Sequence, residues 1–255
     1  VESYFIKRND IAVVNTQTLE ISLKDYHFHY SEVIGDSEKA WLQGINLSYK
    51  SQNPNTKEYW RVSHEQTNHN TDYDGATQSG IPVKTITNNK IKNTEVIFAN
   101  PIADSEGSFA YLGYGYHSWD RNITGSGGYL EKYSWSYIPV GYRHEYKIDD
   151  QWDGAVDIEV KFMFKGQMKA SGMGLIDPFR VRLGNKPGLK IAAPYSYKMN
   201  SQWSMLVTPW YEYSAIRQSN TVILTAGGVP IGAAAYEPNS NTHQYGLDIG
   251  ISYTF

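Results

Sequence analysis

The chain has 255 residues, enough for one large β-domain, and contains 21 tyrosines, 7 tryptophans, 22 glycines and no cysteine. Aromatic residues and glycines at this density favour many short strands joined by turns. The formal net charge of −3 gives no electrostatic argument for nucleic-acid binding. No apolar run reaches the roughly 18 residues that a transmembrane helix needs, so the sequence excludes such a helix.

Apolar and polar side chains alternate from the start of the chain. Leu19, Ile21 and Leu23 alternate with polar residues, and the pattern predicts a bulge near Asp25. After that bulge, Tyr26, Phe28 and Tyr30 are expected to continue the same apolar face. The alternation recurs over residues 44–50 and, more weakly, over 60–62 and 96–98. Because side chains point alternately to the two sides of a strand, each run predicts a strand with one apolar face.

The second half of the chain shows the same pattern more strongly. Alternating runs cover residues 110–117, 138–147, 156–164, 189–198, 205–213 and 243–255. Pro139, Pro194 and Pro209 lie inside these runs. Since proline removes a donor from the ladder, each predicts a bulge or a register that spares its missing N–H. Together the runs predict about ten strands, with eight or twelve as alternatives.

The connections between these runs alternate in length. Short turns are predicted over residues 51–57, 103–108, 149–153 and 200–204. The longer polar connections are 33–39, 66–94, 120–128, 169–187 and 217–241. This alternation is typical of an antiparallel up-and-down transmembrane β-barrel, with periplasmic turns and extracellular loops. We therefore predict a single all-β domain over residues 1–255, in which residues 1–16 are either a periplasmic lead-in or part of the first strand.

Charged residues decide which face of the predicted barrel meets lipid. The polar face carries Glu20, Lys24, Lys50, Arg61, Arg143, Glu145, Lys147, Asp157, Glu159, Lys161, Lys190, Glu212 and Asp248. The apolar face is too bulky to fill the inside of a barrel of this size. We therefore predict that aromatic and aliphatic side chains face lipid. The charged residues, apart from Lys50 and Lys147, are expected to form a network in the lumen.

Opposite charges recur on two neighbouring strands of this network. Arg143 and Glu145 lie on one strand, and Asp157, Glu159 and Lys161 lie on the next, across a short turn. Since all of them share the inward parity, opposite charges can pair across the hairpin. The pairing predicts a plugged or narrow lumen. One interpretation is that these residues stabilise the interior, and the other is a constriction that selects solutes by charge.

The last strand, residues 243–255, resembles the assembly signal of bacterial outer-membrane β-barrel proteins. That signal has a polar residue, a glycine and two aromatic or apolar residues at the end of the chain. The matching positions here are Asp248, Gly250, Tyr253 and Phe255. The resemblance implies an outer-membrane location, a signal peptide that has already been removed, and insertion by the barrel-assembly machinery, which would read Tyr253 and Phe255.

A ten-strand barrel of this length also resembles the omptin proteases in size. Asp72-Tyr-Asp74 is similar to their paired aspartates, although acidic residues in an Asn-rich polar loop are ordinary turn formers. Their companion Asp-x-His is not found after the strand over 156–164, where the chain reads Gly166-Gln-Met-Lys-Ala-Ser171. This departure argues against protease activity.

The remaining candidates for chemistry are weak. His27 and His29 share a face and could both ligate one metal, but no third ligand is evident. His117 and Ser118 are adjacent and so point to opposite faces, which argues against a nucleophile–base pair. No catalytic, cofactor-binding or metal-binding residue is therefore predicted.

One connection is unusually apolar. Residues 221–236 are centred on Gly227-Gly228-Val229-Pro230 and contain almost no polar side chain, which is unexpected for a loop in water. The favoured interpretation is a hairpin that extends the last two strands beyond the bilayer. The alternatives are a cap over the lumen and a patch that contacts a ligand.

These observations predict an integral outer-membrane barrel whose partners are the lipid bilayer and the assembly machinery. The favoured function is a small, narrow channel or porin for passive solute passage. The alternative is a closed barrel whose extracellular loops bind a surface partner, as an adhesin or receptor would. An outer-membrane hydrolase is the third hypothesis. No cofactor and no nucleic-acid partner are expected.

Overall fold

The computed structural model describes residues 14–76, 80–125, 127–172, 174 and 176–255, and its regular structure is all β. The strands are β1 (Thr16–Glu32), β2 (Ser37–Gln52), β3 (Tyr59–Ala76), β4 (Pro82–Pro101), β5 (Ser108–Ile123), β6 (Leu130–Lys147), β7 (Trp152–Ala170), β8 (Phe179–Arg182), β9 (Gly184–Asn185), β10 (Pro187–Ala192), β11 (Tyr195–Lys198), β12 (Trp203–Arg217), β13 (Val222–Ala226), β14 (Val229–Ala235) and β15 (Ser240–Thr254). In this part of the chain, no helix is long and apolar enough to cross a membrane.

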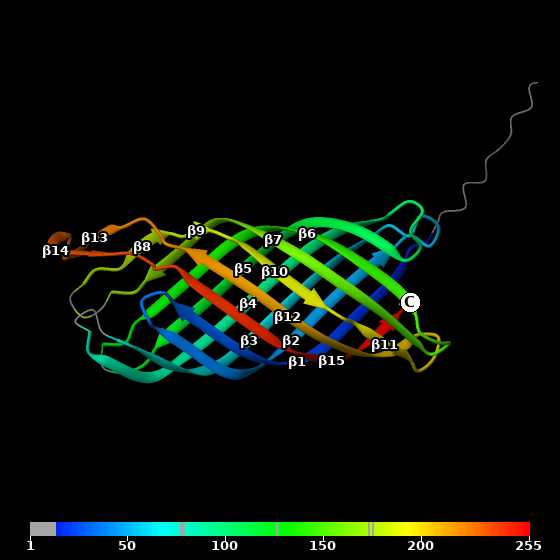
Figure 1. The fold of residues 1–255 in the computed structure, drawn as a ribbon, viewed down its shortest axis with the longest axis horizontal. Coiled ribbons are helices and arrows are strands. Elements are labelled where there is room, and N and C mark those ends of the chain that lie inside the picture. The colour runs from blue at the N-terminus through cyan, green and yellow to red at the C-terminus, as the bar shows by residue number, and fades with distance from the viewer. Residues whose placement is uncertain (1–13, 77–79, 126, 173, 175) are drawn as a thin grey trace, which may run out of the picture.

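The strands form a closed antiparallel barrel with ten strand positions in up-and-down order (Figure 1). Each strand from β1 to β7 pairs with the next along the chain. The short strands β8, β9, β10 and β11 together fill the eighth position, between β7 and β12. The predicted fold class and strand number are therefore confirmed.

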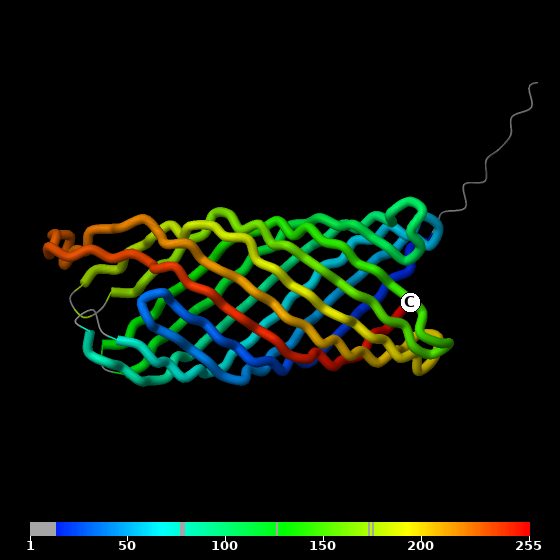
Figure 2. The backbone as a smooth tube through the Cα atoms, viewed as in Figure 1, coloured from blue at the N-terminus to red at the C-terminus, as the bar shows by residue number. Residues whose placement is uncertain are grey.

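The first and last strands close the barrel. β1 pairs with β15 from Thr18 opposite Thr254 to Glu32 opposite Ser240. Beyond the ladder, the backbone N–H of Gln17 donates to the Phe255 carbonyl over 3.2 Å, and the N–H of Phe255 donates back over 3.0 Å. Figure 2 shows the blue tube of β1 running beside the red tube of β15. Since every strand has two neighbours, the main sheet has no open edge to pair with another chain.

The predicted bulge near Asp25 is wrong. Along β1 and β2, Lys24 faces Gly44, Asp25 faces Gln43 and Tyr26 faces Leu42 without a shift. The unbroken register puts Tyr26 on the opposite face from Leu23, so it points into the barrel, where it is 3% exposed. Phe28 and Tyr30 also point inward, so these three side chains form part of an apolar interior and do not face outward as predicted.

Most of the predicted long connection over residues 66–94 is strand. β3 and β4 pair continuously from Tyr59 opposite Ala99 to Ala76 opposite Pro82. The polar side chains that suggested a loop are the outward face of these strands, where Asn68 and Asn70 are exposed. β5 likewise runs to Ile123, and short strands occupy parts of the predicted connections over 169–187 and 217–241. A strand whose outer face meets water has a polar face, which composition alone does not distinguish from a loop.

The three prolines behave differently from one another. Pro194 lies in the gap between β10 and β11, where its carbonyl accepts the N–H of Ala155 on β7 over 2.8 Å. The predicted strand over residues 189–198 is thus interrupted, but both pieces keep one register against β7. Pro139 and Pro209 lie within β6 and β12 without a register shift at their positions.

The barrel has two halves with opposite polarity. We call the half nearest the four short turns the turn half, and the half nearest the long connections the loop half. Around the turn half, exposed apolar side chains form a belt: Leu19, Ile21, Leu23, Ile45, Leu47, Phe98, Leu112, Val140, Ile158, Phe162, Leu247, Ile249 and Ile251. In the loop half the outer face carries many polar side chains, such as Asn68 and Asn70, beside exposed apolar ones such as Trp41 and Ile86. The interior of this half holds a core that includes Phe28, Tyr30, Leu42, Trp119 and Tyr133.

Three of the four short turns are closed by the side chain of an Asn or Asp. The Oδ1 atom of Asn53 accepts the N–H groups of Asn55 and Thr56 at 2.9 and 3.2 Å. Oδ1 of Asp149 and Oδ1 of Asn200 make the same pair of bonds two and three residues ahead. Such side-chain turns replace a longer connection. They therefore keep this end of the barrel compact.

Candidate functional site

The interior of the turn half contains the charged residues predicted for the lumen. Lys24, Asp157, Glu159 and Asp248 are buried, while the others are partly exposed to a cavity or to neighbouring polar groups. The full set, all inward-facing, is Glu20, Lys24, Arg61, Arg143, Glu145, Asp157, Glu159, Lys161, Lys190, Glu212 and Asp248.

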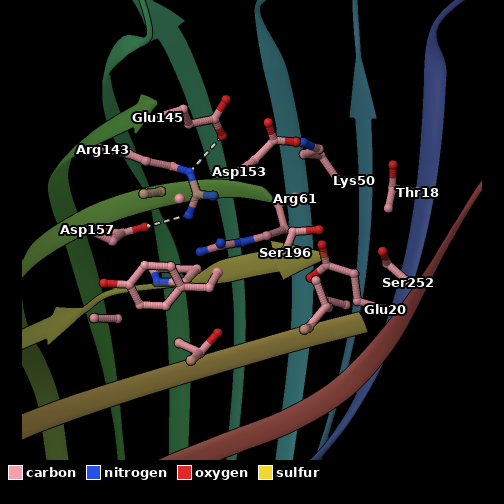
Figure 3. Close-up of a pocket in the computed structure, with 18 of the residues that line it drawn as sticks. Thr18, Glu20, Lys50, Arg61, Arg143, Glu145, Asp153, Asp157, Ser196 and Ser252 are labelled. Carbon is pink, nitrogen blue, oxygen red and sulfur yellow. Dashed lines mark hydrogen bonds and ion pairs between the residues drawn. The ribbon is translucent and has the colours of Figure 1, made fainter. Parts of the chain in front are cut away.

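Most of these charges form ion pairs between strands. Nε of Arg143 on β6 donates to Glu145 over 2.8 Å, and Nη1 donates to Asp157 on β7 over 3.3 Å. Figure 3 shows the Arg143 guanidinium between these two carboxylates. Lys161 on β7 contacts Glu212 on β12 at 2.6 Å. The Arg143–Glu145 bond lies within β6, whereas the contacts with Asp157 and between Lys161 and Glu212 join different strands.

Two carboxylates of this interior were not predicted. Glu65 on β3 lies 2.6 Å from Lys24 and 3.4 Å from Lys190, so it links opposite walls of the barrel. Glu95 on β4 accepts the Tyr137 hydroxyl over 3.0 Å. The alternating pattern in the sequence ends at Val62 for the third strand and begins at Val96 for the fourth. Extending both strands by their period of two would have placed Glu65 and Glu95 inside.

A cavity of about 970 Å³ occupies the turn half. Its wall carries the charged residues described above together with hydroxyl groups from Thr18, Ser48, Ser63, Ser196 and Ser252. Exposed residues of the turns and strand ends, such as Lys57 and Glu106, also line it. The cavity therefore reaches the turn end of the barrel.

Aromatic residues close the inner end of this cavity. The Trp210 indole N–H donates to Asp248 over 2.7 Å, and the Lys24 ammonium lies 4.5 Å from the Trp210 ring centre. Tyr26 packs on Trp210 with ring centres 5.4 Å apart and donates to Thr67 over 3.0 Å. Both rings are buried. They form a ceiling between the cavity and the loop half.

Above the ceiling, stacked aromatic rings fill the interior. The Trp119 ring centre lies 5.9 Å from that of Phe28, 5.2 Å from that of Tyr30 and 5.0 Å from that of Tyr133. All four side chains are at most 4% exposed. Met168 and Val181 complete this core from β7 and β8. We call this group the aromatic plug.

A buried charge network lies next to the aromatic plug. Arg121 on β5 contacts three glutamates: Glu38 on β2 through Nε, and Glu131 on β6 and Glu32 on β1 through Nη1 at 2.7 and 3.5 Å. A fourth, Glu237, accepts the hydroxyls of Tyr30 and Tyr133 at 3.2 and 2.9 Å. Four carboxylates thus share one cation. We call Arg121 and these glutamates the Arg121 network.

The excess of carboxylates shifts the protonation of the Arg121 network, which lies beyond the apolar belt. Burial raises the pKa of Glu32 to about 7, although Arg121 opposes the shift. Burial, together with the carboxylates of Glu131 and Glu32, raises the pKa of Glu237 well above its usual value. The network therefore retains protons at pH values where exposed carboxyl groups have lost them.

The Arg121 network was missed because its members lie in or beside predicted loops. Glu38 falls in the predicted connection over residues 33–39, and Arg121 falls in that over 120–128. The sequence does contain evidence for the position of Arg121, because Tyr111, Trp119 and Arg121 are separated by even numbers of residues and so point to the same side of β5. Continuing the strand from its predicted end would have placed Arg121 inside the barrel.

The weaker candidates do not converge on a site. His27 faces outward, where its ring stacks on Tyr245 at 5.1 Å, and the exposed His29 lies opposite His243. His117 faces inward and stacks on Trp135 at 4.1 Å. In the described part of the chain, no group of three or more His, Cys, Asp or Glu side chains could hold a metal ion.

The paired aspartates lie on a strand and not in a loop, which corrects the expectation from sequence. Asp72 and Asp74 both belong to the exposed outer face of β3. Asp74 pairs with Lys84 on β4 at 2.9 Å, with both side chains largely in solvent. Their position on the outer wall separates them from the interior groups.

The apolar connection forms the expected hairpin, but this hairpin does not extend the ladder of β12 and β15, which ends at Ile216 opposite Ser240. β13 and β14 pair as a separate two-stranded sheet at the loop end of the molecule (Figure 1). Asp177, from the connection before β8, holds its tip, accepting the N–H groups of Gly227 and Gly228 at 3.0 and 2.8 Å. Ile223 and Val229 are 70% and 65% exposed. The hairpin thus presents apolar side chains away from the barrel.

The terminal strand has the arrangement expected of an outer-membrane barrel strand. Asp248 and Gly250 face inward, and a Cβ atom on Gly250 would lie 2.2 Å from the Ile21 carbonyl oxygen. Tyr253 packs on the ring of Trp203, with centres 4.9 Å apart, and Phe255 is exposed at the turn end. Whether these residues act as an assembly signal stays a prediction.

Comparison with known proteins supports the fold and no particular activity. No known protein family and no curated protein matches the chain. The chain is similar to the outer membrane protease OmpT from Escherichia coli, with a TM-score of 0.61 and 10% identity over 96% of this chain and 98% of that one. It is also similar to the outer membrane protein OprG from Pseudomonas aeruginosa, with a TM-score of 0.41 and 9% identity over 95% and 96% of the two chains. At these identities, the similarity to OmpT shows a shared outer-membrane barrel fold.

Proposed function

We propose that the protein is a closed barrel of the bacterial outer membrane whose loop end binds a partner at the cell surface. The apolar belt supports the membrane location, because Leu23, Leu112 and Ile249 are 69%, 61% and 51% exposed. Side chains of this kind are favourable on a barrel surface only against lipid. Short turns then lie in the periplasm and the longer connections lie outside.

The aromatic plug is the observation that carries the closed state. The rings of Phe28, Tyr30, Trp119 and Tyr133 contact one another across the interior, on the loop side of the ceiling that ends the cavity. Dense packing of this kind excludes water and ions. The Arg121 network ties β1, β2, β5 and β6 together beside the plug. A barrel with a closed interior does not conduct solutes, so its function must come from its outer surface.

The loop end supports a role in binding. The long strands extend past the belt toward the loop end, and Figure 1 shows β13 and β14 at the far end of the molecule on that side. The hairpin tip is held by Asp177 and carries exposed apolar side chains. A rigid apolar surface loses less conformational entropy on binding than a flexible loop does. We propose this hairpin as the main contact with the partner.

Conductance in planar bilayers tests the closed state. We expect no discrete current steps from the reconstituted protein. A Trp119→Ala, Tyr30→Ala double variant removes two rings of the plug and should produce steps if it still folds. Discrete, salt-dependent steps from the unmodified protein would overturn the proposal. They would support the narrow channel that the sequence predicts.

Binding by the hairpin is tested separately. Cells that display the protein should adhere to a surface that carries the partner, and deletion of residues 224–233 should remove this adhesion without changing barrel assembly. A matched control is Asp72→Ala, on the outer wall of β3. Equal adhesion of the deletion variant and the unmodified protein would exclude the hairpin as the contact.

A further inference from the structure

We propose that the turn-half cavity binds a hydroxylated organic anion through Lys50 and Arg61. This inference goes beyond the proposed surface binding, because the cavity lies at the opposite end of the barrel. It depends on the geometry of the cavity and does not need the loop end to bind anything. The two residues are neighbours: Lys50 on β2 lies directly opposite Arg61 on β3, and both line the cavity (Figure 3).

The first observation is that these two cations lack the partners that other interior cations have. Within the described residues, Lys50 has no ion pair and no hydrogen bond, and its ammonium lies 5.5 Å from the centre of the Tyr59 ring. Arg61 has one carboxylate contact, with Glu95 at 3.8 Å, and no hydrogen bond. The interior thus holds an adjacent pair of cations with free donors.

Other cations in the interior have close carboxylate partners. Lys24 and Lys161 each contact a glutamate at 2.6 Å, and Arg143 hydrogen-bonds to two carboxylates. Lys50 has the carboxylates of Glu145 and Glu20 nearby and Arg61 has that of Glu95, but neither cation hydrogen-bonds to one of them. Confined N–H donors without an acceptor are unfavourable, because they have lost part of their hydration without gaining a hydrogen bond. A ligand carboxylate or phosphate between Lys50 and Arg61 would supply that acceptor through charge-assisted hydrogen bonds.

The rest of the wall indicates what the anion is attached to. Hydroxyl groups of Thr18, Ser48 and Ser63 line the cavity near the two cations. The carboxylates of Glu20 and Glu145 also line it and could accept hydrogen bonds from ligand hydroxyls. A purely apolar anion would leave these groups unsatisfied. The chemistry therefore favours a sugar acid or a sugar phosphate over a fatty acid.

The size and access of the cavity are consistent with such a ligand. Its volume of about 970 Å³ is at the upper end of the range of about 300–1,000 Å³ found for small-molecule sites. It reaches the turn end past Lys57, Glu106 and Lys147. The ceiling of Tyr26 and Trp210 closes its inner end. The ligand would therefore enter and leave from the side of the short turns.

Calorimetric titration of the full chain in detergent micelles tests the site. The probes are glucose 6-phosphate, glucuronate and uncharged glucose, which share a hydroxylated sugar ring and differ in the anionic group. We expect at least one of the two anions to bind about tenfold or more tightly than glucose, as one charge-assisted contact would give. The preferred anion then shows whether the site takes a phosphate ester or a carboxylate.

Variants assign the binding to the two cations. Lys50→Gln and Arg61→Gln should each weaken binding of the preferred anion about tenfold, whereas Lys50→Arg should retain it. Lys90→Gln, on the exposed outer face of β4, is the matched control and should leave the affinity unchanged. The thermal transition of each variant, measured in the same detergent, shows that the barrel is intact.

Three results would overturn the proposal. Binding of glucose as tight as that of the tighter-binding anion would show that charge does not matter. Failure of both anions to bind at millimolar concentration would show that the cations do not form a site. Unchanged affinity in folded Lys50→Gln and Arg61→Gln variants would place the anion elsewhere. None of these results bears on conductance or on surface adhesion.

Discussion

Nη1 of Arg121 on β5 lies 2.7 Å from Oε2 of Glu131 on β6, and these side chains are only 3% and 4% exposed. The ion pair belongs to a network in which Glu32, Glu38 and Glu237 are also buried. A single cation therefore offsets a group of carboxylates that water does not reach. Removing it should affect stability more than removing a surface charge would.

Replacing Arg121 with Gln should lower the free energy of unfolding by about 3–5 kcal/mol, the range for breaking a buried ion pair. The physical reason is that Glu38 and Glu131 would stay buried without a counter-charge. Thermal or denaturant unfolding in detergent measures the change. Arg180→Gln is the control, because Arg180 is exposed on β8 and its loss should cost little. Similar losses for both variants would contradict a central role for Arg121.

The Arg121 network should make stability depend on pH. The pKa of Glu32 is raised from 4.5 to about 7 in the folded protein, so the folded state keeps a proton that the unfolded state loses. Stability should therefore fall as the pH rises from about 4.5 through 7, by on the order of 1–3 kcal/mol. Glu237, whose pKa is also raised, acts in the same direction. Unfolding transitions measured at pH 5 and pH 8 test the trend.

Glu32→Gln is the variant that isolates this effect. It resembles the protonated carboxyl group and should reduce the difference between the two pH values, mainly by stabilising the protein at the higher one. Glu58→Gln, at an exposed turn position, should leave the pH dependence as it is. An unchanged pH dependence in Glu32→Gln would show that other groups cause it.

Because Gly115 lies very close to the Tyr137 ring, replacing the glycine with a larger residue should destabilise the barrel. A Cβ atom on Gly115 would lie 2.0 Å from Cζ of the Tyr137 ring. Gly115→Ala should displace this ring and break the hydroxyl bonds to Asn93 and Glu95, at a cost of about 1–3 kcal/mol. In a Tyr137→Ala background the same substitution should cost much less. Additive effects in this double-mutant cycle would rule out the steric explanation.

The hairpin should loosen when Asp177 is removed. Its carboxylate accepts the Thr225 hydroxyl at 2.7 Å and two glycine N–H groups, and these bonds lower its pKa. Asp177→Ala should therefore increase the rate of limited proteolysis within β13 and β14. In the unmodified protein the hairpin should stay resistant to proteolysis above the usual pKa of a carboxyl group. It should lose this resistance as the pH falls through the lowered pKa of Asp177. Asp72→Ala is the control, and an equal cleavage rate in both variants would contradict the prediction.

A charge within the apolar belt should be costly. Ile249 is 51% exposed at the middle of β15, and Ile249→Lys should destabilise the reconstituted barrel by about 2–4 kcal/mol if this face meets lipid. Asn70→Lys, on the water-facing wall of β3, should be nearly neutral. The measurement is unfolding in lipid vesicles. Equal tolerance of both substitutions would count against a membrane location for the belt.

The turn half was largely predictable from sequence. Asp157 and Glu159 are expected inside, and Val156 and Ile158 outside. The structure has this arrangement, because the side chains of β7 alternate without interruption through the belt. The prediction succeeded where lipid outside and charge inside produce a clean period of two. Strand lengths were underestimated because nothing in a polar run marks where the belt ends and water begins.

The loop half was not predictable in the same way. Tyr26 and Leu23 are both apolar, so the alternating pattern predicts one shared face and a bulge near Asp25. The structure places them on opposite faces because the surroundings of the barrel change between them. Local alternation cannot show such a change, since it defines two faces without saying which one is buried. The Arg121 network required the register of β1, β2, β5 and β6, which no single stretch of sequence contains.

The continuous ladder of β1 has a consequence for how this barrel can evolve. Its inward positions change from Ser22 and Lys24 to Tyr26 and Phe28 without a shift in register. One inserted residue early in this strand would exchange both faces at once, bringing Lys24 to lipid and Tyr26 to water. Two inserted residues would return both faces of the strand to their original sides. Homologous barrels that keep this two-part interior should therefore differ in strand length by even numbers of residues, and odd differences should be confined to the connections.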